Sequence, residues 1–189
     1  MKHILTLLLL LIAFTAKGQN PTDSIGLWAV HDGNMKRMEK ITFQKVKGSG
    51  GLGSAFSFGL AKIKAKMEFK GATSEHIFEG TAKFRMIFGN PPIQQMQSLY
   101  MFANKSNMRN FEVAKFQVKK NTRLLTGVSA SILGSQVGVS SADDVEIVTK
   151  EMGDGIYDIS VKAAPGEYCF MCTTNAMGAL GGVFDFTIK

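Results

Sequence analysis

Hydrophobic and polar residues alternate along much of this chain, and a period of two is typical of β-strands. Apolar side chains recur at every second position over residues 84–88, 128–132 and 184–188. The first of these runs stops at Asn90-Pro91-Pro92, because proline has no backbone N–H to donate to a neighbouring strand. The pattern therefore predicts short strands separated by firm breaks.

Turn residues join these strands into antiparallel hairpins. A polar turn at residues 119–122 separates a strand over residues 111–118 from its return arm at 123–126. Asp154-Gly155 supplies the positive φ of a tight hairpin turn, and Pro165-Gly166 makes a further turn. The whole pattern gives about nine or ten short strands, with no alternation of strands and helices. We therefore predict an all-β fold, namely a two-sheet antiparallel β-sandwich.

Two stretches allow more than one interpretation. Residues 56–69 fit helical spacing as well as two strand segments. Strands are favoured there, because lysines alternate strictly over residues 62–66 and because Gly59 inside a helix would cost about 1 kcal/mol. Residues 93–102 have a looser spacing that fits either one short helix or an irregular excursion.

Residues 1–18 read as a signal peptide rather than as part of the fold. Lys2 and His3 precede an apolar run over residues 4–14, and Ala16 and Gly18 place small residues at the two positions that a signal peptidase reads. The apolar run is too short to span a bilayer comfortably. We therefore predict cleavage after Gly18, a single β-sandwich domain over residues 19–189 with no membrane-spanning segment, and a location in the periplasm, outside the cell or at the cell surface.

The composition indicates a folded, basic protein. Hydrophobic residues make up 45% of the 189 residues and charged residues 20%, so the chain can fill a core without a metal ion or a disulfide. Loss of residues 1–18 removes two lysines and no acidic residue, which lowers the formal net charge from +7 to +5. Nucleic acid is not an expected partner, because the protein is exported and its aromatic residues occupy core positions of the strand pattern.

Several segments of the chain carry a resemblance to a group of known sequences. They are residues 82–88 (AKFRMIF), 110–116 (NFEVAKF), 119–125 (KKNTRLL), 165–168 (PGEY) and 183–186 (VFDF). In this order they resemble uncharacterised secreted β-sandwich proteins that are common in Bacteroidota-like bacteria. The resemblance implies an exported β-sandwich, and it implies no activity, cofactor or catalytic residue.

Cys169 and Cys172 form a C-x-x-C pattern, which can serve as a redox pair or as a soft-metal site. Three residues of an extended strand span about 10 Å and place the two side chains on opposite faces, whereas a disulfide needs Cα atoms closer than about 7 Å. We therefore expect each thiol to be buried or half-buried in a structural role. A bridge or metal site, and a disulfide between two molecules through an exposed thiol, remain open.

Lys62, Lys64 and Lys66 would form a positive stripe along one strand face. Such a stripe can attract anionic glycans or lipid head groups. Solvated lysines also protect the edges and outer faces of sheets, and this role is favoured.

No motif in the chain indicates an enzyme. Neither a Gly-x-Ser-x-Gly elbow nor a His-Glu-x-x-His zinc motif occurs, and only His31 and His76 remain after the signal peptide is removed. We therefore predict no catalytic residue, no cofactor and no metal, and a non-catalytic module that binds an envelope glycan, a peptide or another envelope protein, or that has a structural role. The alternative is a thiol-active or soft-metal-binding factor that uses Cys169 and Cys172, or a cryptic hydrolase.

Overall fold

The structure is a computed structural model that describes residues 25–47, 63–103, 110–130, 145–172 and 182–189. The predicted signal peptide (1–18), the glycine-rich residues 48–53 and Lys62 lie outside these ranges. Within the ranges the chain forms thirteen strands and one short helical segment. The fold is therefore all-β, as the alternating pattern predicts.

The first sheet contains five antiparallel strands in the order β10–β11–β6–β1–β2. These strands are β1 (Gly26–His31), β2 (Asn34–Arg37), β6 (Ala82–Ile87), β10 (Glu146–Gly153) and β11 (Ile156–Lys162). The turn between β10 and β11 has Asp154 at φ 45° and Gly155 at φ 76°. A two-residue hairpin turn of type I′ has positive φ at both positions, so the predicted turn is confirmed.

The middle sheet contains the most buried strands of the described chain. Its order is β5–β13–β12–β7, in which β5 runs parallel to β13 and the other pairs are antiparallel. These strands are β5 (Ile77–Phe78), β7 (Phe111–Lys115), β12 (Gly166–Cys172) and β13 (Phe184–Ile188). Every residue of β13 is buried, and so is every residue of β12 after Gly166.

The third sheet is antiparallel and has the order β3–β4–β9–β8. Its strands are β3 (Lys45–Lys47), β4 (Ile63–Lys70), β8 (Gln117–Lys119) and β9 (Thr122–Ala130). The chain passes into this sheet from the middle sheet at Phe116, whose N–H still donates to the carbonyl oxygen of Glu167 at 2.8 Å. The hairpin of β8 and β9, with Lys120 at φ 51°, confirms the predicted polar turn.

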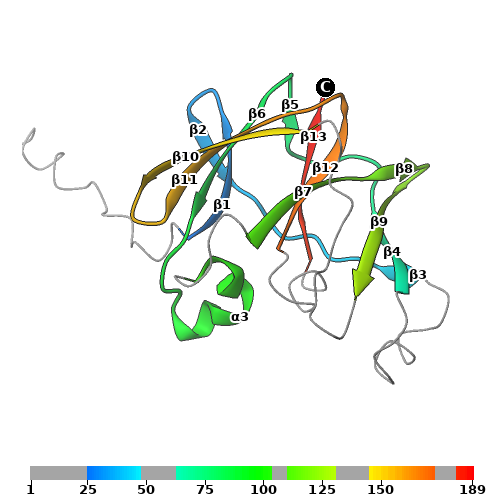
Figure 1. The fold of residues 1–189 in the computed structure, drawn as a ribbon, viewed down its shortest axis with the longest axis horizontal. Coiled ribbons are helices and arrows are strands. Elements are labelled where there is room, and N and C mark those ends of the chain that lie inside the picture. The colour runs from blue at the N-terminus through cyan, green and yellow to red at the C-terminus, as the bar shows by residue number, and fades with distance from the viewer. Residues whose placement is uncertain (1–24, 48–62, 104–109, 131–144, 173–181) are drawn as a thin grey trace, which may run out of the picture.

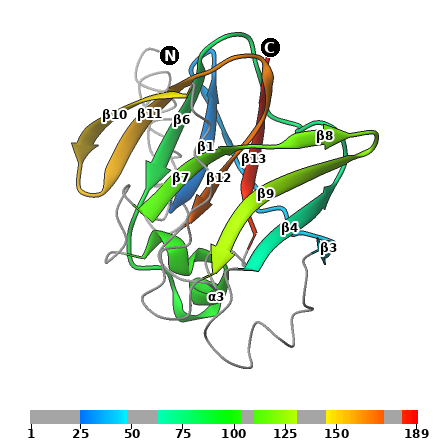
Figure 2. The same cartoon turned by 45° about the vertical axis from the view of Figure 1, so that its right-hand side comes forward.

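The middle sheet lies between the two other sheets (Figures 1 and 2). One of its faces, which carries Tyr168, Phe170 and Phe186, belongs to a large apolar cluster shared with the first sheet. The opposite face, which carries Cys169 and Met171, belongs to a smaller cluster shared with the third sheet. Alternate residues of the same strands therefore fill two separate interfaces.

The fold is sandwich-like, as predicted, but it has three sheets where the sequence pattern predicts two. It also has more than the predicted count of about nine or ten strands. Four of the strands, β2, β3, β5 and β8, have only two to four residues, which is too short for alternation to be visible. The third sheet arises because the chain changes sheets at Phe116, and a strand pattern does not reveal such a change of direction.

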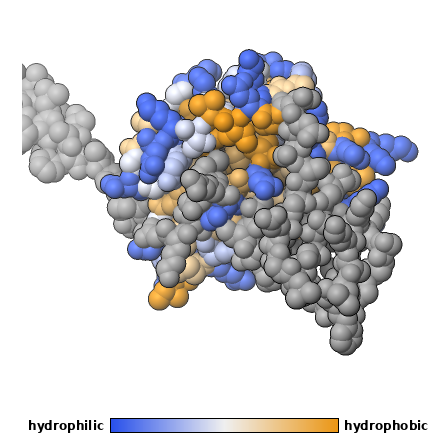
Figure 3. All heavy atoms as spheres, viewed as in Figure 1, coloured by the Kyte–Doolittle hydropathy of each residue, from blue (hydrophilic) through white to orange (hydrophobic). Residues whose placement is uncertain are grey.

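Residues 93–102 form the short helical segment that was one of the two interpretations of this stretch. It consists of the 3-10 turn η2 (Ile93–Gln95), the α-helical turn α3 (Met96–Leu99) and the 3-10 turn η3 (Tyr100–Phe102). Leu99, Met101 and Phe102 are buried in the large cluster, whereas Ile93 is exposed. Figure 3 shows hydrophobic residues at the lower left, where this segment lies in Figure 1. None of the helices in the described ranges has the length and apolar character that a membrane crossing requires.

Candidate functional site

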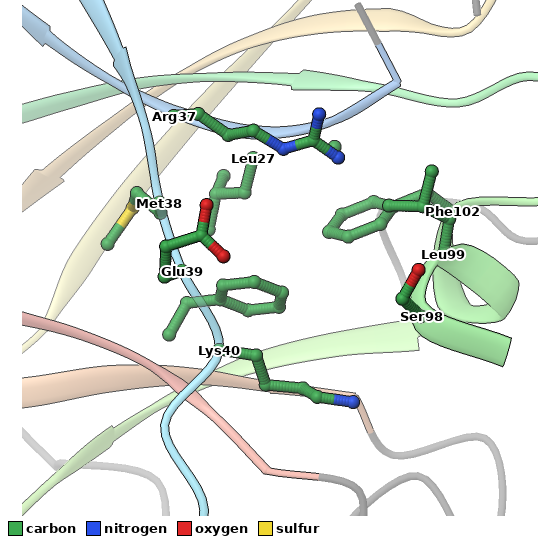
Figure 4. Close-up of a pocket in the computed structure, with 10 residues that line it drawn as sticks. Leu27, Arg37, Met38, Glu39, Lys40, Ser98, Leu99 and Phe102 are labelled. Atoms are coloured by element: carbon green, nitrogen blue, oxygen red, sulfur yellow. The ribbon is translucent and has the colours of Figure 1, made fainter. Parts of the chain in front are cut away.

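A pocket of about 360 Å³ opens between the residues that follow β2 and the helical segment (Figure 4). Its floor is apolar, and its rim carries charged and polar side chains; we call it the charged pocket. The lining residues are Gly26, Leu27, Arg37, Met38, Glu39, Lys40, Ser98, Leu99, Phe102 and Phe184. They come from the first sheet, the residues that follow β2, the helical segment and β13, so the pocket exists only when these segments are assembled.

Arg37 is held in place at the rim by its own contacts. Its Nη2 donates a hydrogen bond to the carbonyl oxygen of Ile25 at 3.1 Å, and its guanidinium lies 5.8 Å from the centre of the Trp28 ring. Gly26, at φ +140°, passes directly beneath it, and a methyl group there would lie 3.5 Å from the same Nη2. These contacts fix the direction of the guanidinium before any ligand binds.

Lys40 is positioned by an unusually close approach of two chain segments. Ile41 and Val183 exchange two backbone hydrogen bonds of 2.8 and 2.9 Å. A methyl group on the neighbouring Gly182 would lie 2.5 Å from the carbonyl oxygen of Ile41 and 2.8 Å from Cγ of Lys40. Only glycine fits at this position, and its φ of +106° is also one that other residues rarely adopt.

The three charged side chains of the pocket are not paired with one another. Figure 4 shows the guanidinium of Arg37, the carboxylate of Glu39 and the ammonium of Lys40 extending into the same space, opposite Phe102 and Ser98. Among the described residues no ion pair joins these three groups to each other or to further charges. The pocket therefore offers two cations and one carboxylate to a ligand.

The lysine stripe predicted from the sequence is not part of this pocket. Lys64 and Lys66 lie two residues apart on β4 in the third sheet, and Lys66 is exposed. Lys62 lies outside the described residues. Because Met67 and Phe69 fill the buried face of β4, Lys66 occupies its outer face, where a lysine is solvated.

Cys169 and Cys172 lie on opposite faces of β12, as extended geometry predicts. Cys169 belongs to the smaller cluster and Cys172 to the large one; neither forms a disulfide, and each has at most 1% of its surface exposed. Burial raises the pKa of the Cys169 thiol, and the nearby Asp185 raises it further. Thiolate chemistry is disfavoured at such a site.

We expect both thiols to be unreactive in the folded protein. A thiol-specific reagent such as Ellman's reagent should label neither cysteine under native conditions and two cysteines in denaturant, because both thiols are buried out of reach of the reagent and burial also raises the pKa of Cys169. The variant Val118→Cys, which places a thiol at an exposed position, serves as the positive control and should add one fast-reacting group. Rapid native labelling of the unaltered chain would contradict the geometry of β12.

Sequence reasoning missed a buried polar cluster between the middle and third sheets. Arg123 of β9 donates through Nη1 to Asp185 Oδ2 at 2.6 Å and to Glu167 Oε2 at 3.3 Å. Thr187 donates to Glu167 Oε1 at 2.8 Å, and the backbone N–H of Ser74 donates to Glu167 Oε2 at 3.0 Å. All these residues are buried, so the cluster joins the sheets and is closed to a substrate.

His76 lies close to this buried polar cluster and is also buried. Burial lowers its pKa, and the charge of Lys36 lowers it further, so the ring is neutral at pH 7. Its Nδ1 has no hydrogen-bond partner among the described residues. No group of three His, Cys, Asp or Glu side chains in the described ranges is arranged to hold a metal ion.

Comparisons with protein-family models, curated proteins and solved structures found no match to this chain. The charged pocket therefore has to be judged from its own chemistry. The sequence does not reveal this pocket, because its residues come from segments that are far from one another along the chain. The one local signal is the run of charges at Lys36, Arg37, Glu39 and Lys40, which interrupts the strand pattern.

Proposed function

We propose that this chain is an exported, non-catalytic binding module of the cell envelope, in the periplasm or at the cell surface, and that the charged pocket is its ligand site. The observation that carries the proposal is the set of three charges, Arg37, Glu39 and Lys40, that stand above an apolar floor and form no ion pair within the described part of the chain. The apolar run and small residues near the N-terminus support export. The two buried thiols do not line the pocket, so the thiol-active alternative has less support.

The chemistry of the pocket favours an amino acid or short peptide with an apolar side chain. A volume of about 360 Å³ suits a small ligand. Arg37 and Lys40 can hold a carboxylate, and Glu39 can accept hydrogen bonds from an ammonium group. The Leu27, Phe102 and Phe184 side chains can cover an apolar side chain. A neutral glycan can form hydrogen bonds to these three groups but offers none of them an opposite charge.

Apolar dipeptides such as Ala-Phe are expected to bind the purified protein in isothermal titration calorimetry. Amidation of the dipeptide's carboxyl end removes the charge that faces Arg37 and Lys40, and acetylation of its amino end removes the charge that faces Glu39. A hydrogen bond to a charged group contributes about 1.5–3 kcal/mol, so each modification should weaken binding about ten-fold or more.

Charge-neutralising variants test the same assignment from the protein side. Lys40→Gln and Arg37→Gln should weaken binding of the free dipeptide but leave binding of its amidated form almost unchanged. Glu39→Gln should likewise weaken binding of the free dipeptide but leave binding of its acetylated form almost unchanged. Lys119→Gln, which removes an exposed charge from β8 in the third sheet, is the matched control. The proposal fails if no dipeptide with a small, aliphatic or aromatic side chain binds, or if Lys119→Gln weakens binding equally.

A further inference from the structure

Strand β10 is the longest sheet edge in the described part of the chain. It pairs on one side with β11, and no described strand lies against its other side. The remaining edge strands, β2, β3, β5, β7 and β8, have two to five residues, whereas β10 has eight. Figures 1 and 2 show β10 and β11 as a hairpin at the outer side of the first sheet. The free side of β10 presents a row of backbone donors and acceptors that can template another strand.

The side chains of β10 are exposed throughout, including large apolar ones. Ile147 is 42% exposed and Val148 is 56% exposed. Ile147 lies opposite Val161, which is buried in the large cluster, so Ile147 is on the inner face of the hairpin and Val148 on the outer face. Figure 3 shows mostly hydrophilic side chains on the left, where the hairpin lies in Figure 1, so these apolar residues have a polar surround. An apolar centre with a polar rim is the composition of a protein interface.

We propose that β10 pairs with β10 of a second copy of this chain, antiparallel and about a two-fold axis at Val148. The two strands would extend the first sheet of each molecule into one continuous ten-stranded sheet. This inference is independent of the ligand proposed for the charged pocket.

Register and charge select the second copy as the partner. In a regular antiparallel pair, two facing residues either both point their backbone groups toward the partner strand or both point them away. Two identical strands can meet this condition only when the two-fold axis lies on a residue. An axis at Val148 sets Val148 against Val148, Ile147 against Thr149, and Glu146 against Lys150 on both sides. The pairing therefore contains two opposite-charge contacts and a pair of β-branched side chains, both of which stabilise sheets.

Neighbouring registers of β10 lack the contacts between Glu146 and Lys150. An axis at Lys150 sets two lysines against each other, and an axis at Thr149 sets Ile147 against Glu151 and Val148 against Lys150. An axis at Ile147 sets Val148 against Glu146. The irregularity between Glu151 and Gly153 ends regular pairing at the turn, so the strand cannot slide far in that direction.

Cysteine trapping tests the register directly. In the proposed dimer the Cα atoms of two Val148 residues lie about 4.5–5.5 Å apart, which suits a disulfide. Val148→Cys should therefore form a covalent dimer under mild oxidation. Thr149→Cys, one residue away and also exposed, faces Ile147 and should form at least ten-fold less. The two native thiols are buried and do not interfere.

Charge reversal tests the partner contacts in solution. Sedimentation equilibrium of the purified protein should show a monomer–dimer equilibrium. Glu146→Lys and Lys150→Glu should each weaken dimerisation about ten-fold, since each sets two pairs of like charges face to face, and the double variant should restore it. The inference is overturned if the protein stays monomeric at several hundred micromolar, if Thr149→Cys is trapped as readily as Val148→Cys, or if the double variant is not restored. Each variant's melting temperature and dipeptide binding show whether the fold and the pocket remain intact.

Discussion

Replacement of Arg123 by methionine is expected to lower the free energy of unfolding by about 3–5 kcal/mol, because it removes one partner from a buried charged cluster. The guanidinium of Arg123 contacts the carboxylates of both Glu167 and Asp185, and all three side chains are less than 10% exposed. Methionine fills much of the same volume but leaves two carboxylates without a counter-charge between the sheets. Urea denaturation followed by circular dichroism measures the loss.

Arg85→Met is the matched control for this prediction. Arg85 pairs with Asp158 through two short hydrogen bonds of 2.7 and 2.9 Å, but both side chains are about one-third exposed. A solvated ion pair contributes only about 0–1 kcal/mol. Arg123→Met should therefore lower the free energy of unfolding more than Arg85→Met does, because burial and not the number of hydrogen bonds decides the loss. Equal losses for Arg123→Met and Arg85→Met would contradict the expectation that the buried cluster costs more stability to break than the solvated ion pair.

Replacement of Phe186 by alanine should cost a similar amount, about 3–5 kcal/mol, on the face of β13 opposite to Asp185. The Phe186 ring is fully buried and contacts the rings of Phe84, Tyr168 and Phe170, with centroids 4.9 to 5.7 Å apart. Removal of the ring leaves a cavity between the first and middle sheets, which neighbouring rings cannot fill without leaving their own contacts. The same urea titration measures the effect.

Phe43→Ala provides the comparison for an identical change in side-chain size. Phe43 is only half-buried beside the smaller cluster, and its ring contact with Phe69 is a longer one of 6.5 Å. Its loss should cost less than half as much as the loss of Phe186. If the two variants were equally stable, the large cluster would not be the main apolar interface of the fold.

Local features of the fold were predictable from the sequence. The hairpin turn at Asp154-Gly155 depends on residues that adopt positive φ, and the end of the strand before residue 90 depends on two prolines that cannot donate hydrogen bonds. The positions of Cys169 and Cys172 on opposite faces follow from the period of two in a strand. Each of these features is fixed by a few neighbouring residues.

The layering and the charged pocket were not predictable in this way. The alternation of Phe184 and Phe186 with Asp185 and Thr187 resembles a strand with one face in water, yet both faces are buried. Asp185 and Thr187 can be buried because other strands supply their polar partners, Arg123 on β9 and Glu167 on β12. The charged pocket likewise combines residues from four distant segments. Such contacts depend on tertiary structure that a pattern of neighbours does not contain.

The position of the middle sheet has a consequence for the order in which the fold can be completed. Strands β12 and β13 follow every strand of the first and third sheets in the sequence. A ribosome releases a chain from its N-terminus, so these outer sheets emerge before the layer that separates them is complete. Their apolar faces cannot pack against a complete middle sheet until residues 184–188 have been made. Most of the burial of apolar side chains that stabilises the protein is therefore delayed until then. Under the export proposed above, this order would keep the chain unfolded, and so able to cross a membrane, until β12 and β13 have been made.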